Sequence, residues 1–208
     1  VNPTQGGLNG KIIRVTTLDS EGPGSIKEAI ETKGPRVVLF EVGGVIDLNK
    51  GNLDITEPFL TIAGQTAPFP GITFIRGGFW INTHDIVIQH ISVRPGDAGE
   101  PKRSGWSPDG LTTSGGNAYN KIIDHCSFTW AVDENLSASG RRTEGPGSTS
   151  HKITFSNNII AECLSNSSHE KGEHSKGTLI HDFCRDIAIV GNLFAHNAMR
   201  NPYFKAHS

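Results

Sequence analysis

The stretch Asp124-His-Cys-Ser-Phe128 has three related segments elsewhere in the chain. These are Gln89-His-Ile-Ser-Val93, Ser156-Asn-Asn-Ile-Ile160 and Val190-Gly-Asn-Leu-Phe194, and the successive offsets are 35, 32 and 34 residues. Self-similarity at a period of about 20 to 50 residues is typical of solenoids, in which each unit buries its apolar face only against its neighbours. The repeat therefore predicts a stack of β-coils.

Stacking the four segments predicts two columns of side chains. One is apolar and consists of Val93, Phe128, Ile160 and Phe194; the other consists of Ile91, Cys126, Asn158 and Asn192. Two stacked asparagines are able to share amide hydrogen bonds along the stack and to satisfy buried turn carbonyls, as asparagine ladders do in cross-β structures. The alternative is that the two asparagines lie in unrelated turns, because Asn is common in turns.

The composition agrees with an all-β chain. Twenty-five glycines, eleven prolines and 19% charged residues in 208 positions suit short strands joined by turns. We expect one domain over 1–208, with a cap region over 1–35 and β-coils over 36–208, and C-terminal coils missing. In the cap, Ser25-Ile-Lys-Glu28 is a capping box that begins a short helix, which Gly34-Pro35 ends.

The spacing of the strands distinguishes a parallel β-helix from a β-sandwich, which is the alternative fold. We expect the first strands at 36–42, 45–48, 60–62 and 71–75. A sandwich needs turns about every 8 to 12 residues, whereas long polar excursions, Pro95 to Pro108 and Ser137 to His151, separate the later coils. We expect those excursions to lie on one face and to form a groove.

Charge and cysteine usage exclude several classes of protein. A formal charge of −2 and a pI near 6.5 argue against binding nucleic acid or a membrane surface. No apolar run is long enough to span a membrane, and the first residues are not a signal peptide. Cys126, Cys163 and Cys184 lack zinc-site spacing, so we expect buried, inert thiols; a Cys163–Cys184 bridge is the alternative.

Two pairs of charged residues share a 24-residue spacing, which suits neighbouring coils: Asp109 with Asp133, and Lys176 with Arg200. The two aspartates and Glu134 lie at the ends of expected strands, and carboxylates converging from successive coils suit calcium. Lys176 and Arg200 are able to bind the carboxylate of an acidic sugar. The alternative for the carboxylates is solvated acids in turns. Most of the nine histidines are expected to be structural.

Four motifs, one of which contains the opening stretch, resemble the pectate lyases of the first polysaccharide lyase family. They are Leu60-Thr-Ile-Ala-Gly-Gln-Thr-Ala-Pro68, Asp124-His-Cys-Ser-Phe-Thr-Trp-Ala-Val-Asp-Glu134, His174-Ser-Lys-Gly-Thr-Leu-Ile180 and His196-Asn-Ala-Met-Arg-Asn-Pro202. The resemblance runs from about Gly10 to the end of the chain. It implies a right-handed parallel β-helix and a secreted enzyme, extracellular or periplasmic, that cleaves polygalacturonate by β-elimination with Ca²⁺.

The resemblance also implies a role for each candidate residue. Arg200 matches the arginine that acts as the base. Lys176 and Lys205 match substrate-binding cations. Asp109 and Asp133 match calcium-binding aspartates, and Glu134 is adjacent to them. The implied partner is polygalacturonate or a pectin oligosaccharide, with neither nucleic acid nor membrane.

Two other functions remain open at this point. A β-helical polygalacturonan hydrolase would need a suitable pair of carboxylates, but Asn-Thr-Asp, Asp-Asp and Gly-His-Gly, which its family usually shows, do not occur here. A pectin-binding or inactive truncated lyase is the other alternative. The chain begins inside the family pattern and stops at Lys205-Ala-His-Ser208, so we expect truncation at both ends, or association through an uncapped C-terminal end.

Overall fold

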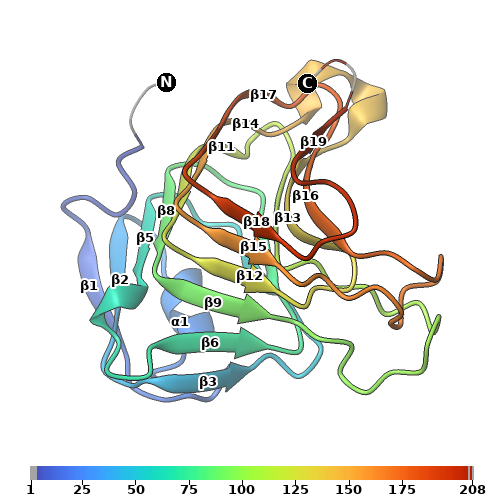
Figure 1. Cartoon of the computed structure of the whole chain (residues 1–208). Coiled ribbons are helices and arrows are strands. Elements are labelled where there is room, and N and C mark those ends of the chain that lie inside the picture. Colours follow the sequence, from blue (N-terminus) through green and yellow to red (C-terminus); the bar gives the residue numbers. More distant parts are fainter. Residues whose placement is uncertain (1–3, 206, 208) are drawn as a thin grey trace.

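A computed structural model describes residues 4–205 and 207. The chain coils through three parallel sheets, and each coil adds one strand to each sheet (Figure 1). The first sheet has seven strands: β1 (Lys11–Val15), β2 (Arg36–Phe40), β5 (Leu60–Ala63), β8 (Ile86–Gln89), β11 (Tyr119–Asp124), β14 (His151–Ser156) and β17 (Arg185–Val190).

The other two sheets have six strands each. The second comprises β3 (Gly44–Asp47), β6 (Ile72–Ile75), β9 (Ile91–Arg94), β12 (Ser127–Thr129), β15 (Ile159–Ala161) and β18 (Leu193–Ala195). The third comprises β4 (Leu53–Ile55), β7 (Phe79–Ile81), β10 (Leu111–Ser114), β13 (Glu134–Ser139), β16 (Lys176–Ile180) and β19 (Tyr203–Phe204). All ladders between these strands are parallel, which confirms the β-helix and excludes the sandwich. The four expected strands end within two residues of the observed ones, but β1, which precedes the helix, was not predicted.

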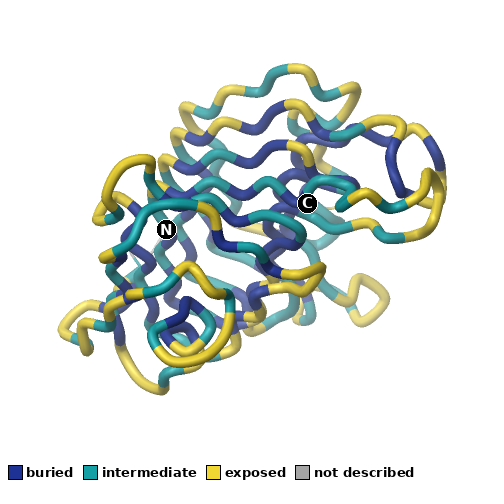
Figure 2. The backbone as a smooth tube through the Cα atoms, turned by 90° about the horizontal axis from the view of Figure 1, so that it is seen from below, coloured by how far each residue is buried: buried dark blue, intermediate teal, exposed yellow. Residues whose placement is uncertain are grey.

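The predicted apolar column runs through the interior of the coils. Phe128 pairs with Val93 on one side and with Ile160 on the other, and Ile160 pairs with Phe194. The first three side chains are fully buried. Figure 2 shows the same regularity along the chain: buried residues recur in successive coils, and exposed residues gather at the turns and loops. The repeat in the sequence is therefore the repeat of the core.

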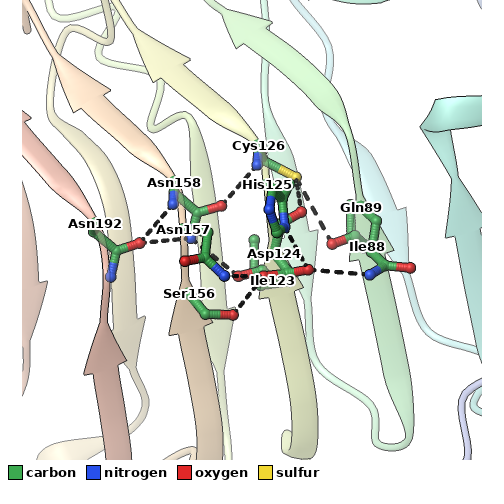
Figure 3. Close-up of polar contacts among 10 residues, drawn as sticks. All are labelled: Ile88, Gln89, Ile123, Asp124, His125, Cys126, Ser156, Asn157, Asn158 and Asn192. Atoms are coloured by element: carbon green, nitrogen blue, oxygen red, sulfur yellow. Dashed lines mark hydrogen bonds and ion pairs between the residues drawn. The ribbon is translucent and has the colours of Figure 1, made fainter.

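The predicted asparagine ladder is present at the turn between the first and second sheets (Figure 3). The Asn158 side chain accepts a hydrogen bond from the backbone N–H of Cys126 at 2.9 Å and donates to the carbonyl of Ile123 at 3.0 Å. Asn192 repeats this pattern one coil later, because its Oδ1 accepts from the backbone N–H and the side-chain amide of Asn158, both at 2.9 Å. The ladder satisfies backbone groups that the turn would otherwise leave buried and unpaired.

Beside the ladder, Asp124 links three coils on the outer side of the same turn (Figure 3). Its carboxylate accepts hydrogen bonds from Ser156 at 2.7 Å, Asn157 at 3.0 Å and Gln89 at 3.1 Å, and lies 2.8 Å from Nδ1 of His125. These bonds to the ionised form hold the pKa of Asp124 well below its usual value, although partial burial opposes them. His125 is thus a hydrogen-bonding partner of Asp124 at this turn.

The helix α1 (Ile26–Glu31) covers the first coils and buries Ile26, Ala29 and Ile30. Ser25 Oγ accepts from the backbone N–H of Glu28 as predicted, and the Glu28 carboxylate accepts from the N–H of Gly24. The helix ends at Glu31, three residues before the predicted stop at Gly34-Pro35. Buried Arg36 lies at this end and donates to the carbonyls of Ala29 and Ile30, which the helix leaves unpaired.

The long excursions are placed differently from the prediction. Residues 95–109 pack against residues 162–175, where the backbone N–H groups of Arg103 and Gly105 donate to the carbonyls of Ser167 and Ser168 at 3.1 and 2.8 Å. The expected excursion Ser137 to His151 begins inside β13, and its remaining residues follow the opposite ends of the third-sheet strands. The two loops therefore flank one sheet on two sides, and the partner of the first loop, 162–175, was missed.

The three cysteines are free and buried, so the alternative Cys163–Cys184 bridge is excluded. Burial raises the pKa of the Cys126 and Cys163 thiols to about 12 and raises that of Cys184 as well, which keeps all three protonated and unreactive. Within residues 4–205 and 207, none of the helices is long and apolar enough to cross a membrane.

Candidate active site

Charged residues from successive coils meet where the strands of the third sheet begin. Asp109 precedes β10 by two residues, Asp133 immediately precedes β13, and Glu134 and Lys176 are the first residues of β13 and β16. Glu134 and Lys176 lie opposite each other in the parallel ladder. Because parallel strands begin at the same edge of a sheet, acids and bases about one coil apart in the sequence become neighbours.

The three predicted carboxylates form one cluster. An oxygen atom from each of Asp109, Asp133 and Glu134 lies within 4.8 Å of the others. The cluster opens into a cavity of about 310 Å³, whose lining also includes Trp80, Thr112, Ser137 and His181. Such a grouping of hard oxygen ligands is one that a divalent cation is able to bind.

Asp109 is tied to the sheet by hydrogen bonds on both oxygens. Its Oδ1 accepts from the backbone N–H of Glu134 at 3.0 Å, and its Oδ2 accepts from the hydroxyls of Thr112 and, at 3.4 Å, Ser137. Burial, and next the negative charge of Asp133, raise the pKa of Asp109 to about 7, and the two hydroxyls oppose the shift. Ionisation of Asp109 beside Asp133 is therefore unfavourable in the absence of a bound cation.

Asp133 is held from the other side by two stacked histidines. His174 Nε2 lies 2.6 Å from Oδ1 of Asp133, and His169 Nε2 lies 3.6 Å from Oδ2; the two rings are 3.8 Å apart, centre to centre. Nδ1 of His169 accepts from the backbone N–H of Lys171 at 3.1 Å, so the proton of the neutral ring is on Nε2, which faces the carboxylate. The histidine pair thus orients Asp133, in the way that neighbouring groups orient metal-binding carboxylates.

The pKa of His174 is lowered, chiefly by burial, while Asp133 opposes the shift and His169 and Lys176 add to it. At neutral pH His174 is therefore an uncharged hydrogen-bond donor, and the negative charge of Asp133 is left for another partner.

Two cations, Arg200 and Lys176, lie next to Glu134. Arg200 forms an ion pair with Glu134 through Nη1 and Oε1, and the Glu134 side chain is buried while that of Arg200 is 24% exposed. Lys176 is buried, and its Nζ lies 2.9 Å from Sδ of Met199. Arg200 thus contacts the cluster through Glu134, and Lys176 lies opposite Glu134 on the adjoining strand.

Lys205 lies further along, directly after β19. Its backbone N–H donates to the carbonyl of Ile180 at 3.0 Å. The pKa of Lys205 is lowered, first by burial and then by the positive charge of Arg142, with Asp182 opposing and Arg200 contributing. The structure thus brings Asp109, Asp133, Glu134 and Arg200 into one group, places Lys176 on the adjoining strand, and puts Lys205 at the border of the same sheet.

Several residues of this group were not found by sequence reasoning. Thr112 and Ser137 were not identified because hydroxyl residues are common in strands. Only the register that pairs Thr112 with Ser137 brings both hydroxyls to the Asp109 carboxylate. His169 lies in the sequence His169-Glu-Lys-Gly-Glu-His174, whose two histidines have no recognised ligand spacing. Their convergence depends on the fold of the loop 162–175.

Comparison with known proteins gives consistent matches over nearly the whole chain. The chain is 34% identical over 201 residues to "Probable pectate lyase C" of Aspergillus terreus and of Emericella nidulans, and 33% identical to the protein of that name from Aspergillus fumigatus. This chain is a homologue of proteins named probable pectate lyase C. The matches cover 96% of this chain and 42% of each relative, so the chain spans less than half of their length. No family model matches the chain.

A solved structure confirms the fold. The crystal structure of Jun a 1, the major allergen from cedar pollen, superposes with a TM-score of 0.67 and covers 97% of this chain and 59% of its own. The sequence identity is 21%, so this similarity concerns the parallel β-helix alone. The resemblance stated from the motifs is thus confirmed by the pectate lyase homologues and, for the fold, by this structure.

Proposed function

We propose that this chain carries the catalytic groove of a calcium-dependent pectate lyase, which cleaves 1,4-linked polygalacturonate by β-elimination. The observation that carries the proposal is the cluster of Asp109, Asp133 and Glu134, with Arg200 in contact and Lys176 on the next strand. The homology to proteins named probable pectate lyase C supports the same reaction.

The cluster fits calcium by the chemistry of its donors. Ca²⁺ takes about six to eight oxygen ligands in flexible geometry, and Asp109, Asp133 and Glu134 would supply carboxylates from two coils. Burial, and next the negative charge of Asp133, raise the pKa of Asp109, and a divalent cation would balance the charge of the two carboxylates. Held by these carboxylates, the ion would supply positive charge that stabilises the negative charge developing on the substrate during elimination.

The residues of the chain have distinct parts in the reaction. Elimination removes the proton at C5, next to the uronate carboxylate, forms the C4–C5 double bond and breaks the bond from C4 to the bridging oxygen. The leaving oxygen takes up a proton and becomes the hydroxyl of the new chain end, and no water is added across the bond. Lys176 and Lys205 bind uronate carboxylates and keep positive potential beside the reacting sugar. Fixed charges of this kind stabilise a transition state because they need no reorganisation.

Arg200 is the proposed base. A guanidinium normally stays protonated, and a base works best when its pKa lies near the working pH. Before Arg200 accepts the C5 proton, its ion pair with Glu134 must open and its guanidinium must lose a proton to solvent, which alkaline pH favours. A cation that binds Glu134 would favour opening of the ion pair. The proposal therefore includes an alkaline optimum for activity.

The proposed substrate and location follow from the same proposal. The partner is polygalacturonate or a pectin oligosaccharide, which is a polyanion, so its affinity depends on local cations in a chain whose formal charge is −2. Pectin lies outside the cell that degrades it, and the protein is therefore proposed to be secreted.

One assay tests the proposal. The protein is incubated with polygalacturonate, with calcium or with a chelator, and the ultraviolet absorbance of the unsaturated product end is followed. We expect absorbance to rise with calcium and to stop in chelator. New reducing ends without absorbance would indicate a hydrolase instead, and binding without cleavage would indicate a pectin-binding protein.

A further inference from the structure

Trp80 is an exposed aromatic residue that lines the cavity beside the carboxylate cluster. It is the middle residue of β7, and its neighbours Phe79 and Ile81 point into the core. Side chains alternate along a strand, so Trp80 points outward. Its exposed fraction is 39%, whereas Thr112 and Ser137, the outward residues next to it in the register, are 2% exposed. The indole is thus the large surface that this part of the sheet presents to solvent.

Trp80 joins two cavities. It lines the cavity of about 310 Å³ that contains Asp109, Asp133 and Glu134, and it also lines an adjoining cavity of about 500 Å³. Trp80 pairs directly with Thr112, whose hydroxyl holds Asp109. Neighbouring strands are about 4.8 Å apart, so Trp80 lies one strand away from the residue whose hydroxyl binds Asp109.

The adjoining cavity contributes a cation. Its lining includes Arg141 and the acidic residue Glu144, with Asn82 and Asn117 as neutral hydrogen-bonding residues. The Arg141 side chain is 80% exposed and lies 3.3 Å from the Glu144 carboxylate, so its guanidinium has donors available on other sides. A flat aromatic face beside an arginine and amides fits an acidic pyranose: the ring stacks through its C–H face, and the carboxylate meets the guanidinium.

We propose that Trp80 and Arg141 form a second sugar subsite, which binds a uronate unit of the same chain that reaches the carboxylate cluster. The inference rests on the proposed function, because that function identifies the ligand as a polyuronate. The subsite acts in binding: it adds affinity for oligomers long enough to cover both cavities and leaves the bond-breaking step unchanged.

The test compares Trp80→Ala and Trp80→Phe with the wild-type protein. Binding of digalacturonate and tetragalacturonate in calcium buffer is measured by isothermal titration calorimetry, and KM and kcat are measured from the unsaturated product. We expect Trp80→Ala to weaken tetragalacturonate binding and to raise KM by about tenfold, with kcat within about twofold. Trp80→Phe, which keeps an aromatic face, should lose less affinity. Arg141→Gln should weaken tetragalacturonate binding and should make the remaining affinity depend less on salt concentration.

Trp130→Phe is a matched control, because Trp130 is 45% exposed but lies after β12, outside the linings of both cavities. The melting temperature of each variant shows whether it folds. Unchanged tetragalacturonate affinity in folded Trp80→Ala, or equal losses in the Trp130 control, would overturn the subsite while leaving the lyase proposal intact. Failure of the wild-type protein to bind any oligogalacturonate would overturn both.

Discussion

Replacement of Asp109 by Asn tests the electrostatics of the carboxylate cluster. The side chain keeps its shape: Oδ1 still accepts from the N–H of Glu134, and the new NH₂ group donates to the hydroxyls of Thr112 and Ser137, which reverse their roles. Only the negative charge beside Asp133 is lost. In the presence of chelator, we therefore expect Asp109→Asn to stabilise the folded protein at alkaline pH.

The magnitude follows from the raised pKa. Burial and Asp133 raise the pKa of Asp109 from 3.8 to about 7, and each pKa unit corresponds to about 1.4 kcal/mol, so the ionised carboxylate destabilises the fold by about 4 kcal/mol. Below about pH 4 the group is protonated in both states and contributes nothing. Between pH 4 and about 7 the unfolded state releases a proton that the folded state keeps, so wild-type stability falls as pH rises; above about 7 the loss is constant.

The assay is urea denaturation of both proteins in chelator across this pH range. The advantage of Asp109→Asn should grow from near zero at about pH 4 to about 4 kcal/mol at about pH 8, which corresponds to roughly 10 °C in melting temperature for a chain of this size. Calcium at alkaline pH should then stabilise the wild-type protein and have little effect on the variant. Asp54→Asn, an exposed carboxylate on the same sheet, is the control. An advantage that is the same at all pH values would refute the reasoning.

Three other variants test separate parts of the structure. Asn158→Ala leaves the N–H of Cys126 and a carbonyl buried and unpaired, so urea denaturation should show a loss of about 3 kcal/mol, whereas the exposed Asn157→Ala should lose less than about 1 kcal/mol. His174→Gln should weaken calcium binding by about tenfold or more in calorimetry, because it frees Asp133; unchanged affinity would argue against the orienting role. Arg200→Lys should abolish formation of the unsaturated product without lowering the melting temperature, and full turnover would exclude Arg200 as the base.

Much of the fold was predictable because the structural repeat of a solenoid is also a repeat in its sequence. The offsets of 35, 32 and 34 residues placed Val93, Phe128 and Ile160 in one column and Asn158 over Asn192 in another, and both columns are observed. Periodicity did not reveal β1, which precedes the helix and whose residues are mostly exposed. Nor did it reveal which loops meet, because loop packing depends on contacts such as Arg103 with Ser167 rather than on a repeat.

The clustering of the three predicted carboxylates could be inferred from the sequence, whereas the contacts that each of them makes could not. Asp109, Asp133 and Glu134 meet because neighbouring coils begin their third-sheet strands at one edge. The Glu134–Arg200 ion pair and the two histidines on Asp133 follow from side-chain directions after long turns, which no spacing in the sequence specifies.

The sequence by itself determined the repeat, the parallel β-helix and the residue types that gather at one edge, because stacking in register requires only periodic apolar and asparagine positions. The tertiary structure alone decided how the charges are paired and how exposed each group is. Burial in the cluster raises the pKa of Asp109, and outward exposure on β7 frees the face of Trp80. Both depend on what the neighbouring coils and loops cover, and that is a property of packing in three dimensions.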